Sequence, residues 1–281
     1  MKFLFTPRKK DSHKGDYGHV LLMGGSATKP GAILLAGKAA LRTGSGKVTV
    51  GLPDKAFRKL SKNFLELMYE PFPSTTSGTF SKQGTKKLKK VLEGKDVVVV
   101  GPGMGINADT KAVLSFLLKN SNSPLVLDAD ALNCISEIGT KRALSFIPQG
   151  NHVVLTPHPG EMARLLGTTM KKVQANRIKI ARDFSRTHGV HLVLKGFRTI
   201  IANPSGKIFV NTTGNPGMAT AGMGDLLAGM IGSLIGQGID FEKSIRLAVY
   251  LHGQAGDRVA KRLGDRGLLA TDVIEEIPPI S

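Results

Sequence analysis

The sequence predicts an α/β fold with a mostly parallel central sheet, helices on both faces of the sheet and a β-hairpin late in the chain. Six short runs rich in β-branched residues are apolar on both faces, which is typical of buried parallel strands. The intervals between them could each hold a helix. Two further runs, at 198–202 and 207–211, are joined by NPSG and predict the hairpin. The six runs are HVLLM (19–23), KVTVG (47–51), DVVVV (96–100), PLVLD (124–128), HVVLT (152–156) and HLVLK (191–195).

The chain predicts one domain over residues 1–281. Its 281 residues are 41% apolar, which suffices for a substantial core. No internal repeat, low-complexity tract or Pro/Ser-rich linker divides it. A single domain is therefore the simpler interpretation.

One amphipathic helix is predicted over residues 171–189. A cluster of side chains falls near one side of it, lysines and arginines are free for solvent on the other, and Gly189 supplies a stop. The clustered residues are Val173, Arg177, Ile178, Ala181 and Phe184.

The charge balance favours acidic partners. The chain has 39 Lys and Arg against 21 Asp and Glu, a formal net charge of +18, which suits nucleotides, phosphates, nucleic acid or anionic lipid. Nucleic acid is disfavoured, because the chain has no Trp, only three Tyr and no dense basic tail beyond KKLKK at 86–90. We expect small-molecule nucleotides as partners, and no nucleic acid.

Cysteine and apolar content indicate the compartment. Cys134 is the single cysteine, so no intrachain disulfide can form, and no Cys/His spacing resembles a structural zinc site. The first ten residues hold too few apolar side chains for a secretory signal, and no window approaches ~18 uninterrupted apolar residues. We expect a cytoplasmic protein that does not enter a membrane.

Polar or glycine-rich segments follow five of the predicted strands at their carboxyl ends, the edge where ligands bind in parallel α/β sheets. A purely structural sheet would need glycine at only one or two such turns, so we interpret this edge as a nucleotide cleft. The segments are GGSATKPGA (24–32), GPGMG (101–105), DADALN (128–133), TPHPGE (156–161) and KGFRT (195–199).

Asp225 is the candidate catalytic base. The glycines of AGMGD (221–225) allow backbone amides to point at a common centre, and the apolar run 226–235 predicts a buried helix whose free amino-terminal amides would hold a phosphate. In this anion hole Asp225 could take a proton from an attacking hydroxyl group. The alternative is that Asp225 only caps the helix. The helix dipole would also weaken the carboxylate as a base, because it stabilises the anion.

Asp128, Asp130 and Asn133 are candidate metal ligands. They follow the fourth predicted strand, and their oxygens could hold Mg2+ directly or through water, an ion that phosphoryl transfer normally needs. Capping of the next helix is the alternative role for these residues.

Two common phosphate-binding motifs are absent. No Lys-Ser/Thr follows the glycines before Asp225, as in a Walker A loop, and GPGMG lacks the third glycine of a dinucleotide fingerprint. From about Lys14 to about Asp272 the chain instead resembles the ADP-dependent NAD(P)H-hydrate dehydratases of the ribokinase-like superfamily. TPHPGEMARLLG (156–167) and NPGMATAGMGDLLAG (215–229) are the specific motifs. The resemblance implies a ribokinase-like three-layer sandwich, without the epimerase domain that many members carry.

The resemblance also implies a reaction that repairs a damaged cofactor. ADP would phosphorylate the hydroxyl group on carbon 6 of hydrated NADH or NADPH (NADHX, NADPHX), and loss of phosphate would regenerate NADH or NADPH with AMP as by-product. Mg2+ would assist, and relatives form tetramers. A small-molecule alcohol kinase of the same fold, for a hydroxymethylpyrimidine, pyridoxal or thiazole alcohol, is the alternative, because the same anion hole and base would serve it.

Site residues carry over from the resemblance position by position. Those matching contacts with the hydrated cofactor are Ala32, Gly103, Gly105, His158 and Asp225. Those matching contacts with the adenine nucleotide are Lys195, Gly196, Phe197, Arg198, Thr199 and Gly224. Taken alone, Lys195 would be an exposed lysine at a strand end, His158 a turn histidine bonded to its own loop, and Ala32 and Gly103 signs of tight packing.

Overall fold

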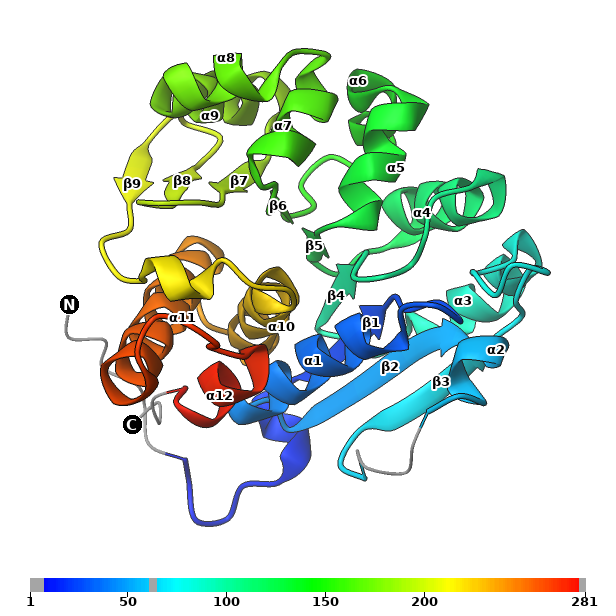
Figure 1. The fold of residues 1–281 in the computed structure, drawn as a ribbon. Coiled ribbons are helices and arrows are strands. Elements are labelled where there is room, and N and C mark those ends of the chain that lie inside the picture. Colours follow the sequence, from blue (N-terminus) through cyan, green and yellow to red (C-terminus); the bar gives the residue numbers. More distant parts are fainter. Residues whose placement is uncertain (1–7, 61–64, 278–281) are drawn as a thin grey trace.

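The computed structural model describes residues 8–60 and 65–277, and one sheet of nine strands runs through these ranges (Figure 1). The strand order is β3-β2-β1-β4-β5-β6-β7-β8-β9. Pairs from β3 to β7 are parallel, whereas β7–β8 and β8–β9 are antiparallel. The strands are β1 (His19–Met23), β2 (Lys47–Pro53), β3 (Met68–Phe72), β4 (Val97–Val100), β5 (Leu125–Leu127), β6 (Val153–Leu155), β7 (His191–Leu194), β8 (Ile200–Ala202) and β9 (Ile208–Val210). The predicted parallel sheet and late hairpin are confirmed.

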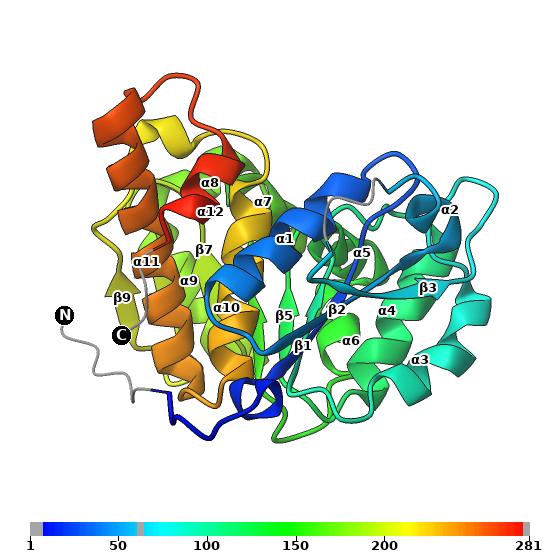
Figure 2. The ribbon, with the colours of Figure 1, turned by 90° about the horizontal axis from the view of Figure 1, so that it is seen from below.

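Helices cover both faces of the sheet (Figures 1 and 2). One face carries α1 (Pro30–Arg42), α10 (Met223–Gly236), α11 (Phe241–Leu263) and α12 (Ala270–Glu275). The other carries α3 (Thr85–Val91), α4 (Ala108–Asn120), α5 (Asp130–Ile138), α6 (Thr140–Leu144), α7 (Pro159–Leu166), α8 (Met170–Ala175) and α9 (Arg177–His188). The short helix α2 (Asp54–Phe57) follows β2, and single 3-10 turns lie at Lys14–Tyr17, Lys82–Gly84 and Pro216–Met218.

The strand pattern explains the two cores. Side chains of a strand alternate between faces, so Val20 and Leu22 of β1 pack into the core beneath α1 and α10, and Leu21 and Met23 into the core on the opposite face. All four are fully buried. A strand apolar at every position is therefore what two helical layers require.

The edge strand β3 was missed by the sequence prediction. Its sequence, MYEPF, contains a proline and a glutamate and is only partly buried. Proline is tolerated in an edge strand because one side of the backbone has no partner there. β3 pairs with β2 alone, so it needs no run of β-branched residues.

The predicted helix over 171–189 is wrong in two respects. Asn176, with φ −137° and ψ 36°, ends α8 and precedes α9, so two short helices replace one. Ile178, expected on the inner side, is 48% exposed, whereas Val173, Ala181 and Phe184 are buried as predicted. Gly189 ends α9 in the left-handed conformation, also as predicted.

Glycines let α10 lie close to its neighbours. A methyl group on Gly229 would lie 2.1 Å from the carbonyl oxygen of Ala36 in α1, and one on Gly232 would lie 2.5 Å from Val99 of β4. Every residue from 226 to 236 is buried, as the apolar run predicts.

Within the two described ranges, no helix is long and apolar enough to cross a membrane.

Candidate active site at the carboxyl edge of the sheet

Asp225 lies in the first turn of α10. The helix begins at Met223, its N-cap is Gly222, and Asp225 is its third residue. Gly222 has φ +91°, a conformation that an L side chain rarely adopts, and no side chain caps the helix. The alternative that Asp225 serves as the cap is therefore wrong. Its carboxylate is left for another role at the amino-terminal end of the helix.

The surroundings of Asp225 raise its pKa. Burial is the largest cause, the nearby carboxylate of Asp128 is the next, and Lys195 opposes them. The result is a pKa of about 7 instead of 3.8. Burial thus outweighs the acidifying effect expected from the helix dipole. A carboxylate with this pKa is suited to accept a proton near neutral pH.

Lys195 and Asp128 form a buried ion pair next to this turn. Lys195 follows β7 and donates from Nζ to Asp128 Oδ1 at 2.6 Å, while the Thr156 hydroxyl donates to the same oxygen at 2.7 Å. The side chains of Lys195 and Asp128 are 18% and 1% exposed. A methyl group placed on Gly224 would lie 3.1 Å from Lys195 Nζ. Lys195 is therefore not an exposed strand-end lysine, and it lies against the predicted anion hole.

A second acid, Glu161, reaches the same lysine. Its Oε2 lies 3.9 Å from Lys195 Nζ and accepts a hydrogen bond from the His158 amide at 2.7 Å. Burial alone would lower the pKa of Lys195, but the carboxylates of Asp128 and Glu161 raise it. The lysine therefore stays charged in a buried setting.

His158 caps helix α7. Its Nδ1 accepts from the amides of Gly160 and Glu161 at 3.0 and 3.3 Å, and its Nε2 lies 3.3 Å from Glu161 Oε1. The turn-histidine alternative therefore describes its bonding. Half of the side chain is nevertheless exposed at the carboxyl edge of the sheet. Burial lowers its pKa, with help from the charge of Lys195.

The predicted nucleotide loop, 195–199, is held from behind by Arg177. This guanidinium donates to the carbonyl oxygens of Leu194 and Lys195 at 3.1 and 3.3 Å, and also to that of Phe197. The ring of Phe197 is 83% exposed, and Gly196 and Arg198 are exposed as well.

Arg198 and Thr199 show how tightly this loop turns. Arg198 has φ +51°, an uncommon conformation for a side-chain-bearing residue. Thr199 donates from its hydroxyl to the Gly196 carbonyl at 3.0 Å. The loop therefore presents an aromatic face and a cation outward.

The predicted cofactor contacts Ala32 and Gly103 lie together. Ala32 is in the first turn of α1, and a methyl group on Gly103 would lie 3.2 Å from its Cβ and 2.7 Å from the Lys29 carbonyl oxygen. Gly103 has φ +67°. Gly105 donates its amide to Asp130 Oδ2 at 3.0 Å. These small residues bring the backbone after β1, β4 and β5 into one surface.

Comparisons with known proteins identify the family. The family described as NAD(P)H-hydrate dehydratase matches residues 20–279. This chain belongs to the NAD(P)H-hydrate dehydratase family. The membership confirms the resemblance predicted from the sequence.

Individual members resemble the chain over most of its length. The "ADP-dependent (S)-NAD(P)H-hydrate dehydratase" of Neisseria meningitidis is 38% identical, over 96% of this chain and 87% of that protein. The "Bifunctional NAD(P)H-hydrate repair enzyme Nnr" of Moorella thermoacetica is 44% identical over 97% of this chain, but only 51% of the relative is covered. The chain thus spans about half the length of the first curated relatives that it matches.

Solved structures share the fold of the chain. The ADP/ATP-dependent NAD(P)H-hydrate dehydratase of Bacillus subtilis, co-crystallised with ATP/Mg2+, has a TM-score of 0.84 at 31% identity and covers 98% of this chain and 92% of its own. A ribokinase-like superfamily protein of Enterococcus faecalis has a TM-score of 0.78 at 32% identity, over 97% and 89% of the two chains. The predicted ribokinase-like fold is confirmed.

The candidate metal ligands of this family member engage different partners. Asp128 is bonded to Lys195, whereas Asn133 Oδ1 accepts from Arg164 Nε at 2.8 Å and its Nδ2 donates to Asp130 at 3.4 Å. Across the described residues, no three His, Cys, Asp or Glu side chains converge on a metal position. The capping alternative is wrong, because the N-cap of α5 is Ala129 and no side chain caps it.

The sequence prediction does not single out two residues of the candidate site. Glu161 enters the sequence prediction only as part of a motif, although its position, three residues after His158, is the capping-box spacing that indicates their mutual bonds. The sequence predicts Arg177 on the inner side of a helix. An arginine there signals a buried partner, because its guanidinium cannot be left without hydrogen bonds.

Proposed function

We propose that this protein repairs hydrated NADH and NADPH by ADP-dependent dehydration of their S epimers. The products are NADH or NADPH, AMP and phosphate. Membership in the NAD(P)H-hydrate dehydratase family supports this function, as do the names of the relatives from N. meningitidis and B. subtilis. The observation that carries it is a largely buried Asp225, with a pKa of about 7, at the amino-terminal end of a helix beside Lys195.

The first step is phosphoryl transfer. Asp225 takes the proton from the hydroxyl on carbon 6, and the hydroxyl oxygen attacks the terminal phosphorus of ADP as the bond to AMP breaks. The amides of the first turn of α10, including that of Gly224, hold the transferring group, because a helix amino terminus favours anions. Lys195 supplies a positive charge to the same group.

The second step is elimination. The lone pair of the ring nitrogen expels phosphate from carbon 6, and loss of a proton from carbon 5 restores the dihydronicotinamide ring. Phosphorylation thus converts hydroxide, a poor leaving group, into phosphate, a good one. We assign contacts with ADP to the exposed ring of Phe197 and the cation of Arg198, in the loop between β7 and β8.

The charge of the site suits Mg2+. Asp128, Asp130, Glu161 and Asp225 interact electrostatically, with Lys195 as the cation among them. This excess of carboxylates favours a divalent cation, and Asp128 and Glu161 are the residues that would hold it, together with phosphate oxygens and water. When bound, Mg2+ shields the charge of the phosphates.

Product analysis tests the function. Purified protein is incubated with NADHX, Mg2+ and either ADP or ATP, and the return of reduced-nicotinamide absorbance is followed with AMP and phosphate release. An alcohol kinase would instead leave a stable phosphomonoester on its substrate and would not restore the absorbance. Absence of NADH formation with either nucleotide would overturn the proposal.

A substitution tests the role of Asp225. Asp225→Asn removes the base but keeps its shape, so turnover is lost while the affinity for ADP changes little. A fully active variant would refute the assignment.

We also propose a homotetramer that binds neither nucleic acid nor membranes. Sedimentation tests the oligomeric state, and a salt-dependent duplex-binding assay tests the absence of nucleic-acid binding.

A further inference from the structure

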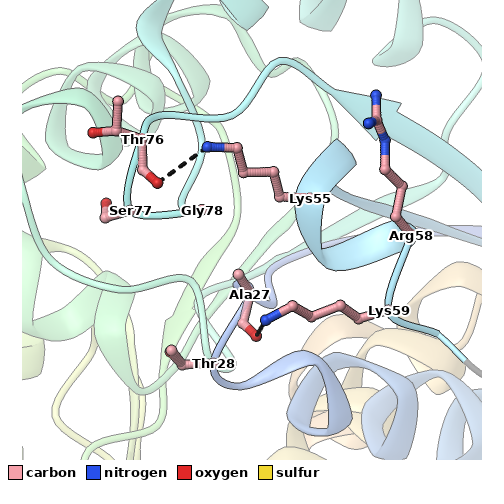
Figure 3. Close-up of a pocket in the computed structure, with 8 residues that line it drawn as sticks. All are labelled: Ala27, Thr28, Lys55, Arg58, Lys59, Thr76, Ser77 and Gly78. Carbon is pink, nitrogen blue, oxygen red and sulfur yellow. Dashed lines mark hydrogen bonds between the residues drawn. The ribbon is translucent and has the colours of Figure 1, made fainter.

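A basic pocket lies beside the cofactor-binding surface but contains none of its predicted residues (Figure 3). It has a volume of about 490 Å³ and is formed by three segments. Ala27 and Thr28 come from the loop between β1 and α1, residues 76–78 from the turn after β3, and three cations from α2 and the residues that follow it. The cations are Lys55, Arg58 and Lys59, and none of the eight lining residues is acidic.

The two lysines are directed into the pocket by backbone carbonyls. Lys55 Nζ donates to the Thr76 carbonyl oxygen and Lys59 Nζ to that of Ala27, each at 3.1 Å (Figure 3). An ammonium group has three donors, so each of these bonds leaves capacity for a ligand.

The nearest acid of α2, Asp54, is engaged elsewhere. It accepts from the Ser74 hydroxyl and the Lys55 amide, and Arg58 lies 3.9 Å from it. The hydrogen bond from Ser74 is the main reason that its pKa lies below the usual range. The pocket therefore keeps a net positive charge that suits an anion.

The pocket is continuous with the surface that carries Gly103 and Gly105. A methyl group on Gly78 would lie 2.3 Å from Ala27 Cβ, and one on Gly105 would lie 2.8 Å from the side chain of Thr79, the residue after Gly78. A methyl group on Gly103 would touch Lys29, two residues after Ala27. Backbone segments in direct contact thus connect the pocket with the catalytic edge.

The strand order separates this pocket from the donor nucleotide. Asp128 follows β5 and Lys195 follows β7, whereas the pocket flanks the ends of β1 and β2. Three strand spacings separate β5 from β2, roughly 14 Å in all. That separation lies within the span of an extended dinucleotide, with the donor ADP on the β7 side of its nicotinamide ring.

We propose that this pocket binds a phosphate group of the hydrated dinucleotide. The inference rests on the proposed function, because it places the hydrated nicotinamide at Asp225. Two phosphate sources have the same chemistry: the 2′-phosphate, which only NADPHX carries, and the diphosphate linker, which both substrates carry. A 2′-phosphate in the pocket makes the enzyme prefer NADPHX, whereas the diphosphate gives no preference.

Binding of NADPH and NADH distinguishes these sources, because the two probes differ only in the 2′-phosphate. Titration calorimetry measures each probe against wild type, Lys55→Ala, Lys59→Ala and the double variant, at two salt concentrations. Lys243→Ala is the matched control, because it removes an exposed lysine near the opposite, amino-terminal edge of the sheet. Lys243 lies two residues after Phe241, and the ring of Phe241 packs on His152 and His191 at the amino-terminal ends of β6 and β7. Circular dichroism verifies that each variant is folded.

The expected result is a loss of affinity of about tenfold for each lysine removed, as for a charge-assisted hydrogen bond in a solvated site. Loss confined to NADPH assigns the 2′-phosphate, and equal loss for both probes assigns the diphosphate. Unchanged binding of both, or a loss no larger than that of the control, overturns the proposal.

Turnover separates this inference from the proposed function. The KM for ADP stays unchanged in the lysine variants, because ADP lies at Lys195, and a raised KM for ADP alone would assign the pocket to the donor and overturn the proposal. Should wild type bind NADPH through these lysines yet fail to dehydrate NADPHX, the proposed function fails while the phosphate pocket stands.

Discussion

Replacing Asp225 with asparagine should stabilise the folded protein at alkaline pH while it abolishes catalysis. The folded-state pKa of Asp225 is raised, so the fold favours the protonated carboxyl group over the ionised one. Wild type therefore loses stability as the pH rises from the ordinary aspartate pKa toward about 7, and the loss is complete above that value. Asparagine is neutral at every pH and resembles the protonated form in shape.

The magnitude follows from the pKa. It rises from 3.8 to about 7, and since a tenfold change in an acid constant corresponds to about 1.4 kcal/mol, ionisation costs the folded state roughly 4 kcal/mol at pH 8. At pH 5 the unfolded chain has already lost the proton and the folded one has not, so the cost is roughly 1.5 kcal/mol. The stability gained by Asp225→Asn should therefore be roughly 2–3 kcal/mol larger at pH 8 than at pH 5.

Urea unfolding of wild type and variant at the two pH values measures this difference, and the slope m verifies that the unfolded states are comparable. Asp11→Asn is the control, because Asp11 is exposed near the start of the described chain. A gain that is the same at pH 5 and pH 8, or a variant that is less stable at pH 8, would refute the buried-carboxylate reasoning. Such an outcome would mean that water reaches Asp225 freely in the folded protein.

Three more predictions concern the same edge of the sheet. The ratio kcat/KM should rise with pH through about 7 and then level off, because it reports the pKa of the free enzyme and only ionised Asp225 accepts a proton; a profile that is flat from pH 5 to pH 9 would contradict this. Lys195→Ala should raise the KM for ADP, and an unchanged KM would contradict the nucleotide contact. The same variant should lower the free energy of unfolding by about 3–5 kcal/mol, because it leaves the buried carboxylate of Asp128 unpaired. Wild-type stability in urea would contradict the ion pair. Gly222→Ala should lower the free energy of unfolding by about 1–3 kcal/mol, because of its positive φ and a Cβ that would lie 2.9 Å from Ala270 and Leu35. Gly238→Ala is the control, because Gly238 has a similar φ but open space around it. The difference between the two variants in a thermal melt measures the cost of the clash alone.

Much of the fold was predictable because its signals are local. A strand covered on both faces must be apolar at each position, so β1 and β4 to β7 are visible as continuous runs. The edge strand β3 lacks this requirement and its sequence carries no such run. Asn176 divides the helical segment, and amphipathic periodicity alone cannot locate such an interruption, because the residues on both sides remain helical.

The candidate site was predictable in its position but not in its pairing. Strand ends at one edge indicate where ligands bind, and glycines before Asp225 indicate a close backbone approach. The partner of Lys195 depends on which strands are neighbours, and Asp128 lies 67 residues away in the chain. The pKa of Asp225 likewise depends on burial that tertiary packing sets. Neither the pairing nor the pKa can be predicted from a local sequence pattern.

The clamp that Arg177 forms on the backbone of 194–197 bears on how quickly the donor is captured. Three hydrogen bonds fix this segment before ADP binds, so it loses little conformational entropy on binding. Diffusional encounter of ADP with the protein, and not rearrangement of the loop, should therefore limit the association rate. In stopped-flow mixing, the observed rate should therefore increase linearly with ADP concentration, whereas Arg177→Ala should introduce a plateau set by ordering of the loop.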